Sequence, residues 1–175
     1  LGQPTPVLLA DGKTIIVVYP KGHGRGAIVM KRSLDGGLSW SERLATPSSW
    51  ETSMEVPTIY PIEDNQGRKR LILFSGLYPD RRALSEDNGH RWTEIEKIVD
   101  WGGVVVMSDM IRLKNGTYMA LFHDDGRYIQ NQLERTGIRT IYKTISKDGG
   151  QTWSKPEGIF TRKDVGPCEP GLIRS

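Results

Sequence analysis

The sequence predicts an all-β protein built from repeated antiparallel units. The first observation is a pattern of eight residues, Ser-x-Asp-x-Gly-x-x-Trp, which begins at Ser33, Ser85 and Ser146. The steps between these serines are 52 and 61 residues, inside or just above the period expected of stacked repeat units. The second is a series of short β-rich runs bounded by turn residues. The third is composition: 20 glycines, 10 prolines and 37% hydrophobic residues in 175 fit a turn-rich globular β protein.

Each copy of the pattern reads as a turn between two strands. An Asp in such a turn accepts hydrogen bonds from amides a few residues ahead, a Gly supplies a positive φ, and the Ser hydroxyl adds a local bond. We expect the Trp to fold back and bury its ring under the turn as a small satellite core. The structural residues predicted in this way are Ser33, Asp35, Gly37, Trp40, Ser85, Asp87, Gly89, Trp92, Ser146, Asp148, Gly150 and Trp153.

The first unit begins with two β-rich runs at residues 5–9 and 14–19, joined by a turn that contains Asp11 and Gly12. A Gly-rich loop at 21–26 leads to a third run at 27–32, which ends in the first copy of the pattern. We expect a short fourth strand after Trp40, which would complete a four-stranded antiparallel sheet, the unit of a β-propeller.

The second and third units repeat this plan. The second has expected strands at 55–60, 70–75, a short run into Ser85, and 93–99. The third has expected strands at 104–113, 117–123, 138–145 and 158–161, with a long polar loop at 124–137. Asn115 begins a glycosylation sequon, but Asn115-Gly116 between two alternating strands favours a type I′ turn.

The repeated pattern is similar to the Asp-box of sialidase-type propellers, and the chain resembles a sialidase-like (neuraminidase-like, BNR-repeat) protein over nearly its whole length. The resemblance implies a β-propeller with blades at about 3–50, 51–100 and 101–163 and the first strand of a fourth at about 164–175. Because closed propellers have about four to eight blades, we expect a longer, six-bladed parent protein. The alternative is that two copies of this chain close one ring.

In an up-and-down blade, the loops between strands two and three and between blades lie on the face opposite the Asp-boxes. That face collects acids, arginines and aromatic rings, which suit an anionic or sugar ligand. The predicted substrate-binding residues are Lys21, Arg25, Glu55, Tyr78, His123 and Asp125. Other side chains expected on this face are Trp50, Glu51, Asp80, Arg81, Arg82, Trp101, Asp109, Asp124, Arg127 and Tyr128.

Glu169 and His23 are the predicted catalytic residues. Glu169 follows the third Asp-box and precedes Pro170, so we expect its side chain to point into the central funnel. In sialidases the residue at this place is a Glu that takes the proton of a nucleophilic Tyr, because a charged nucleophile would be repelled by the substrate carboxylate. The resemblance therefore implies that role for Glu169, with the Tyr and two carboxylate-binding arginines beyond residue 175.

The first blade departs from the sialidase pattern. The family's first arginine belongs to an Arg-x-Pro motif, but here the matching residues are Gly2-Gln3-Pro4. The loop at 21–26, where the family has its acid/base Asp, contains no acid. His23 is placed to act as a substitute general acid, since an imidazole titrates near neutral pH, and Arg25 could take part of the carboxylate binding.

The remaining observations limit the classes of partner. A net charge of +3, with charges of both signs interleaved, does not favour nucleic acid. No apolar run approaches the roughly 18 residues that span a membrane. One cysteine, Cys168, excludes an internal disulfide. Three histidines in separate loops predict no metal site, and no cofactor is expected. No signal peptide is predicted, so an extracellular or periplasmic location would depend on one in a longer parent.

We therefore expect a sialidase-like glycosidase that removes a terminal, acidic sugar from a glycan. Two alternatives stay open, because function depends on the site and not on the fold. One is a non-catalytic Asp-box propeller that binds a glycan or a protein. The other is a different carbohydrate-active propeller, a lyase or a glycosidase directed at uronosides.

Overall fold

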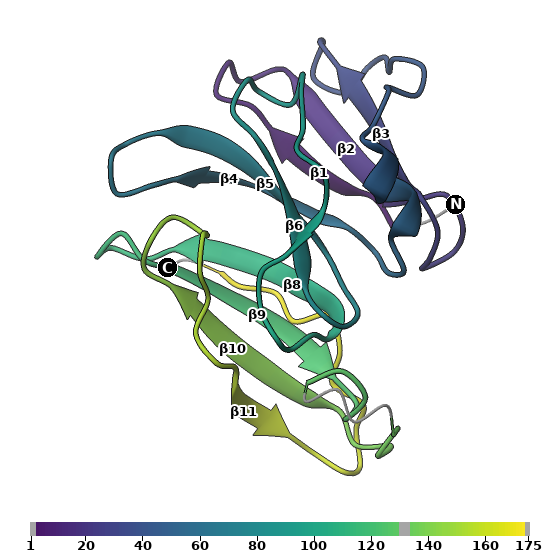
Figure 1. Ribbon diagram of the computed structural model, residues 1–175, viewed down its shortest axis with the longest axis vertical. Helices are drawn as coiled ribbons and strands as arrows, with labels where there is room; N and C mark the ends of the chain where they lie inside the picture. The colour runs from purple at the N-terminus through teal and green to yellow at the C-terminus, as the bar shows by residue number, and fades with distance from the viewer. Residues whose placement is uncertain (1–2, 130–133, 174–175) are drawn as a thin grey trace.

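The computed structural model describes residues 3–129 and 134–173, apart from the side chain of Val106. In this part of the chain the fold is all-β: eleven strands form three antiparallel sheets, with one short 3-10 helix and no α-helix. The sheets follow one another along the chain and lie side by side in space (Figure 1). This confirms the predicted all-β class and the antiparallel pairing of consecutive strands.

The first sheet contains β1 (Thr5–Leu8), β2 (Ile15–Pro20) and β3 (Ile28–Ser33), in that order. The fourth strand expected after Trp40 is wrong. Ser41 and Leu44 donate their amides to carbonyls of β3, but the chain then turns at Pro47 into the 3-10 helix η1 (Ser48–Thr52). This helix places Trp50 in the core, where the side chain is fully buried. The chain leaves the sheet edge so that this ring can be buried.

The second and third sheets have four strands each. The second contains β4 (Thr58–Glu63), β5 (Lys69–Ser75), β6 (Arg81–Ser85) and the two-residue β7 (Glu96–Lys97). The third contains β8 (Val104–Arg112), β9 (Tyr118–Asp124), β10 (Thr140–Ser146) and β11 (Glu157–Thr161). The register between β8 and β9 shifts between Val104 and Asp109, so β8 carries an irregularity that the pattern of its sequence did not indicate.

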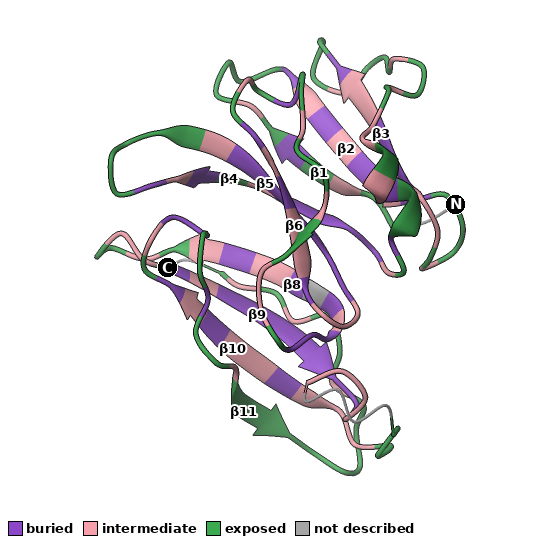
Figure 2. Ribbon diagram, viewed as in Figure 1, coloured by how far each residue is buried: buried purple, intermediate pink, exposed green. Residues whose placement is uncertain are grey.

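Two hydrophobic cores hold the sheets together. Buried and half-buried residues alternate along β2, as expected of a strand with one face on a core (Figure 2). One core joins the first and second sheets around Ile16, Met30 and Leu73. The other joins the second and third sheets around Phe74 and Phe122. The second sheet is therefore packed on both faces.

The three Asp-box turns share one hydrogen-bond pattern. In the third box, Ser146 Oγ donates to Asp148 Oδ1 (2.9 Å), the Gly150 amide donates to Ser146 Oγ (2.8 Å), and the Thr152 amide donates to Asp148 Oδ1 (2.9 Å). The same three bonds recur at Ser33, Asp35, Gly37 and Ser39 and at Ser85, Asp87, Gly89 and Arg91. In each box these bonds lie within a single turn, which is the structural role predicted for the Ser, Asp and Gly residues.

A further repeated position follows each Trp. Ser41, Thr93 and Ser154 each accept a hydrogen bond at the side-chain oxygen from an amide of the neighbouring strand, at 3.0 Å in all three cases. The main-chain amides of the same three residues donate back to the neighbouring strand, to the carbonyls of Arg32, Leu84 and Ile145 respectively. The hydroxyl takes the place of a backbone acceptor, so the repeat extends one residue beyond the Trp.

The Asp-box tryptophans do not form the expected satellite cores. Trp153 is 8% exposed and packs edge-on against Phe74 of the second sheet at 5.7 Å. Trp92 packs edge-on against Trp50, in the core of the first and second sheets, at 5.3 Å. Each of these rings therefore fills the space between its own sheet and the sheet before it. Trp40 has no preceding sheet in the described chain and is 42% exposed.

We expect Asp148→Ala to lower the free energy of unfolding by about 2 kcal/mol, because a charged acceptor shared by four donors is lost. These donors are the Ser146 and Thr152 hydroxyls and two amides. Urea unfolding followed by tryptophan fluorescence measures the loss. Lys147→Ala, an exposed change in the same turn, is the control and should cost no more than about 0.5 kcal/mol. Equal losses for the two variants would contradict a structural role for the aspartate.

Candidate functional site

Charged side chains from all three sheets meet at the end of the sheets opposite the Asp-boxes. They come from the loop after β2, the segment before β4, the end of β9 with its following loop, and the segment after β11. Their mutual electrostatic effects connect them into one group. We call this group the charged cluster; it contains Arg25, Glu55, His123, Asp125, Arg127, Arg139 and Glu169.

Glu55 is the half-buried acid of the charged cluster. Its Oε1 accepts a hydrogen bond from the Val56 amide at 2.8 Å. Burial raises the pKa of the Glu55 carboxyl, and the nearby charge of Glu169 raises it further, while Arg25 and Arg127 act in the opposite direction. The protonated form of Glu55 is therefore favoured more than in an ordinary, exposed glutamate.

His123 lies at the end of β9 and is 5% exposed. Its Nδ1 accepts a hydrogen bond from the amide of Glu169 at 3.3 Å. Burial lowers the pKa of the imidazole, and the charge of Arg139 lowers it further, against the opposing charges of Glu169 and Asp125. A neutral ring is therefore favoured, and this ring supports the chain that carries Glu169.

Asp125 follows directly and holds two arginines. Its carboxylate pairs with Arg127 at 2.7 Å and with Arg135 at 3.2 Å. Burial acts to raise the pKa of Asp125, but the bond from Arg127 and the charges of both arginines outweigh it and lower the pKa. The Arg127 guanidinium also lies over the Tyr128 ring, 4.9 Å from its centroid. The guanidinium of Arg127 is thereby fixed in orientation.

The neighbouring Asp124 shapes the loop that carries these arginines. It accepts hydrogen bonds from the amides of Gly126, Tyr128 and Ile129 at 2.7–3.3 Å. Burial nevertheless raises the pKa of this carboxyl above its ordinary value. Residues 130–133 of the loop lie outside the described chain. Asp124 therefore acts on the start of the loop, where its carboxylate accepts hydrogen bonds from main-chain amides.

Glu169 lies in the segment after β11, and its side chain is exposed in the described chain. Its carboxylate accepts a hydrogen bond from Gln3 Nε2 at 3.1 Å, so the segment before β1 and the segment after β11 meet here. Its φ of 46° lies in the left-handed region, where a non-glycine residue needs support from its surroundings. The described residues 164–173 contain no strand, so the expected first strand of a fourth blade is absent from them.

Three of the predicted residues stand apart from the charged cluster. Lys21 and His23 are exposed in the loop after β2, and that loop is closed by main-chain bonds from Lys21 to Ala27 and from Gly22 to Arg25. The Tyr78 hydroxyl donates to Asp100 at 3.1 Å, and Asp100 also pairs with Lys97 at 2.6 Å. Tyr78 therefore belongs to a separate group at the outer side of the second sheet.

Sequence reasoning missed Gln3, Arg135 and Arg139. Arg139 precedes β10 and acts on His123 through its charge, while its guanidinium donates to the Gly166 carbonyl at 3.3 Å. Gln3 carried a usable signal, because Gln3-Pro4 and Glu169-Pro170 are similar positions in successive units. Arg135 and Arg139 carried none, since an arginine in a polar loop is most often only solvated.

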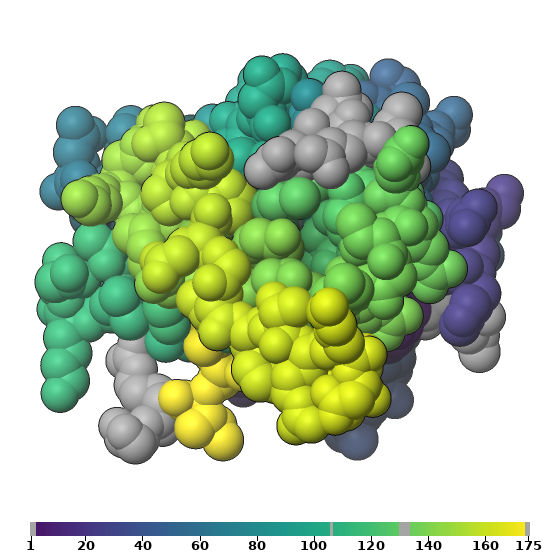
Figure 3. Space-filling model, turned by 90° about the horizontal axis from the view of Figure 1, so that it is seen from below, coloured from purple at the N-terminus to yellow at the C-terminus, as the bar shows by residue number. Residues whose placement is uncertain are grey.

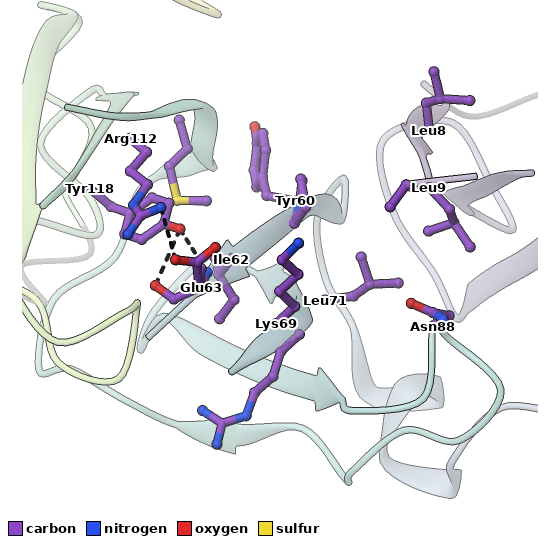
Figure 4. Close-up of a pocket in the computed structure, with 14 residues that line it drawn as sticks. Leu8, Leu9, Tyr60, Ile62, Glu63, Lys69, Leu71, Asn88, Arg112 and Tyr118 are labelled. Carbon is purple, nitrogen blue, oxygen red and sulfur yellow. Dashed lines mark hydrogen bonds and ion pairs between the residues drawn. The ribbon is translucent and has the colours of Figure 1, made fainter. Parts of the chain in front are cut away.

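A cavity of about 520 Å³ lies at the other end of β4, on the inner side of the three sheets. Leu8 and Leu9 form one side of it, and Glu63, Arg112 and Tyr118 form the other (Figure 4). Arg112 pairs with Glu63 at 3.2 Å, and the Tyr118 hydroxyl accepts from the Glu63 amide at 2.7 Å. The polar groups of this cavity already bind one another, whereas the charged cluster presents exposed charges at Arg25 and Glu169. We therefore take the charged cluster as the candidate site.

The comparisons with known proteins support one family. The BNR/Asp-box repeat matches residues 144–155, which contain the third Asp-box. An anhydrosialidase of Macrobdella decora is 26% identical over 136 residues, covering 73% of this chain. The chain is similar to sialidase-like proteins with BNR/Asp-box repeats. It spans only 16% of the length of that relative.

Solved structures resemble the sialidase-like chain in fold alone. A protein of unknown function from Dyadobacter fermentans has a TM-score of 0.54 at 14% identity, over 86% of this chain and 52% of its own. A fucose lectin from Kordia zhangzhouensis, solved with methyl-fucoside, has a TM-score of 0.51 at 13% identity, over 91% of this chain and all of its own. Both similarities extend over most of the three sheets.

The described residues contain neither of two further kinds of feature. Across residues 3–129 and 134–173, no group of three His, Cys, Asp or Glu side chains is arranged to hold a metal ion. In the same part of the sialidase-like chain, no helix is long and apolar enough to cross a membrane.

Proposed function

We propose that the sialidase-like chain contributes the charged cluster to a site for a terminal, acidic sugar of a glycan, and that the full-length protein hydrolyses this sugar. The observation that carries the proposal is the meeting of three arginines with Glu55, Asp125 and Glu169 at one end of all three sheets. A sugar carboxylate suits arginine guanidinium groups, which bind carboxylates through paired hydrogen bonds. The similarity to an anhydrosialidase supports this substrate class.

The same chemistry gives roles to the acids. Glu55 would hold the proton that a leaving glycosidic oxygen requires, because its burial favours the protonated form. Glu169 would act on a nucleophile supplied by a part of the protein outside this chain, in the manner of the sialidase Glu. Arg25 would bind the sugar carboxylate. His23 is exposed and is the weaker candidate for the acid.

We further propose that the three sheets are the first blades of a six-bladed propeller. Trp92 and Trp153 each pack against the sheet before their own, whereas Trp40 is 42% exposed. The outer face of the first sheet carries Leu8, which is 56% exposed, and the half-buried Ile15 and Val17. A further Asp-box sheet would cover this face and Trp40. It would come from a longer parent or, as the alternative, from a second copy of the chain.

A second candidate function is glycan binding without hydrolysis. The specific observation in its favour is the loop at 21–26, which contains no acid where the family places its acid/base Asp. A neutral Glu55 could then serve only as a hydrogen-bond donor to the sugar. The two candidates share the ligand class and differ in turnover.

The first test measures binding of a methyl sialoside by titration calorimetry, alongside hydrolysis of a fluorogenic sialoside by the same protein. We expect Arg25→Ala to weaken sialoside binding about tenfold, which equals about 1.4 kcal/mol. Arg43→Ala, an exposed arginine after the first Asp-box, is the charge-matched control and should bind as the parent does.

A neutral methyl galactoside is the ligand control, and Arg25→Ala should leave its binding unchanged. Turnover would favour the hydrolase, whereas binding without turnover would favour the lectin-like alternative. Absence of saturable sialoside binding, or equal affinities for the two arginine variants, would refute the assignment of Arg25 to a sugar carboxylate.

A further inference from the structure

Three side chains of the third sheet hold the main chain of residues 166–172. Asp109 of β8 accepts a hydrogen bond from the Leu172 amide at 2.6 Å. His123 of β9 accepts one from the Glu169 amide at 3.3 Å, and Arg139, next to β10, donates to the Gly166 carbonyl at 3.3 Å. Figure 3 shows the terminal segment, in yellow, lying against the third sheet. A segment without secondary structure is thereby fixed at three points.

The middle point of the three lies at Glu169 itself. This residue has a φ of 46°, a conformation that side chains with a Cβ rarely adopt without external support. Its amide is fixed by His123 and its carboxylate by Gln3. The backbone conformation decides where the side chain leaves the main chain. Loss of the bond to His123 would therefore free the main chain that sets the position of the carboxylate, whose charge acts on Glu55.

The bond dictates the protonation of the imidazole. An amide can donate only to an unprotonated nitrogen, so Nδ1 must be bare and the ring proton must lie on Nε2. The charged groups around the ring are Arg139 from the start of β10, Asp125 from the loop after β9, and Glu169 from the terminal segment. A second proton on the ring would remove the acceptor and place a cation beside Arg139.

We infer that His123 is a positioning residue for Glu169, with Asp109 and Arg139 as the flanking anchors of the terminal segment. The inference deepens the proposed function. It rests on that function in one respect, namely that the Glu169 carboxylate takes part in the site. It assigns to His123 a role through the main chain, distinct from the sugar contact that its place in the loop suggested.

The geometric part of the test needs no ligand. Nitrogen-15 NMR of the imidazole should show the Nε2–H tautomer for His123 at neutral pH, and amide exchange should show protection at Glu169. His123→Leu should accelerate Glu169 exchange at least tenfold, whereas His123→Asn, whose oxygen can occupy the place of Nδ1, should retain the protection. Acidification should remove the protection from the parent but not from His123→Asn.

The control for general destabilisation is Leu121→Ala, two residues earlier on β9 and 8% exposed. It should lower global stability without a selective effect at Glu169. An Nδ1–H tautomer, or Glu169 exchange in His123→Leu no faster than in Leu121→Ala, would overturn the inference.

The ligand part separates the two proposals. If His123→Leu weakens sialoside binding or turnover and His123→Asn restores it, both hold. If the tautomer and exchange agree but no sialoside binds to the parent, the proposed function fails and the positioning stands. If the parent binds sialoside while His123→Leu exchanges as the parent does at Glu169, the positioning fails and the proposed function stands.

Discussion

Phe74→Ala is expected to lower the free energy of unfolding by about 4 kcal/mol, the largest single effect among the changes considered. Phe74 is fully buried on β5 and belongs to the core that joins the second and third sheets. Its ring lies 5.7 Å from Trp153 and 6.4 Å from Tyr60. Truncation would remove the contacts of both rings and leave a cavity that two packed sheets cannot easily close.

Urea unfolding followed by both circular dichroism and tryptophan fluorescence measures this loss. Phe160→Ala on β11 is the matched control, because the Phe160 side chain is 47% exposed, and its cost should stay below about 1 kcal/mol. A loss below 1 kcal/mol for Phe74→Ala would contradict a shared core between the second and third sheets.

The second large effect is a gain of stability at neutral pH in Asp80→Asn. Asp80 lies just before β6 and is fully buried, and neither of its carboxylate oxygens has a hydrogen-bond partner of good geometry within the described chain. Burial raises the pKa of the Asp80 carboxyl well above its ordinary value, and the amide and charge of Arg81 oppose this only in part. The folded protein therefore keeps a proton that the unfolded chain releases.

The sign of the pH dependence follows from this difference. Above the ordinary pKa of 3.8, the unfolded chain loses the Asp80 proton while the folded chain retains it. The contribution of Asp80 to stability therefore falls as pH rises, by up to about 1.4 kcal/mol per pH unit, until the pKa of the folded state is reached. Asparagine has no proton to lose, so the stability advantage of Asp80→Asn should grow between about pH 4 and neutrality.

Unfolding free energies of both proteins between pH 4 and pH 7.5 measure this advantage. Asp100→Asn is the control with the opposite sign, because the bond from Lys97 lowers the pKa of Asp100 and the carboxylate form is favoured on folding. A stability difference between Asp80→Asn and the parent that stays constant with pH would show that Asp80 is ionised in the folded protein.

The repeated pattern was sufficient to predict the sheets, because it fixes local geometry three times over. Asp148 and its equivalents accept hydrogen bonds from residues of their own turn, so no distant contact is needed to form the turn. Alternating strands then predicted the antiparallel pairing. The missing fourth strand of the first sheet could not be foreseen, since it depends on Trp50 being buried against the next sheet.

The turn between β8 and β9 differs from the type I′ turn that its sequence predicted, because the loop is one residue longer than that turn requires. Asn115-Gly116 predicted a type I′ turn, which requires a positive φ at both residues. In the structure the Leu113 amide donates to the Thr117 carbonyl and the Gly116 amide donates to the Leu113 carbonyl. Gly116 has a positive φ of 84°, whereas Asn115 does not. A loop of three residues is formed, so one more residue than the motif implies lies between the strands.

The candidate site was predictable as a face but not as a set of contacts. Loop alternation identified the correct end of the strands for Arg25, Glu55 and His123, because it needs only the order of the strands. The bond between Gln3 and Glu169 joins residues 166 positions apart, and no sequence pattern encodes such a pair. Tyr78 illustrates the reverse error, since its loop reaches this side of the sheet but its hydroxyl turns to Asp100.

The packing of Trp92 and Trp153 on the preceding sheets gives the chain a direction of assembly. Synthesis runs from the N-terminus, so the preceding sheet has already left the ribosome when the Asp-box tryptophan of the next repeat emerges. The tryptophan can therefore pack at once on a surface that is already formed. In a nearest-neighbour array, removal of the last repeat exposes the surface on which that repeat packed. Removal of the first repeat also leaves the Asp-box tryptophan of the second repeat without the surface on which it packs. Truncation at the N-terminus of such a protein should therefore cost more stability than truncation at the C-terminus. During synthesis, each new repeat can pack on the sheet that precedes it.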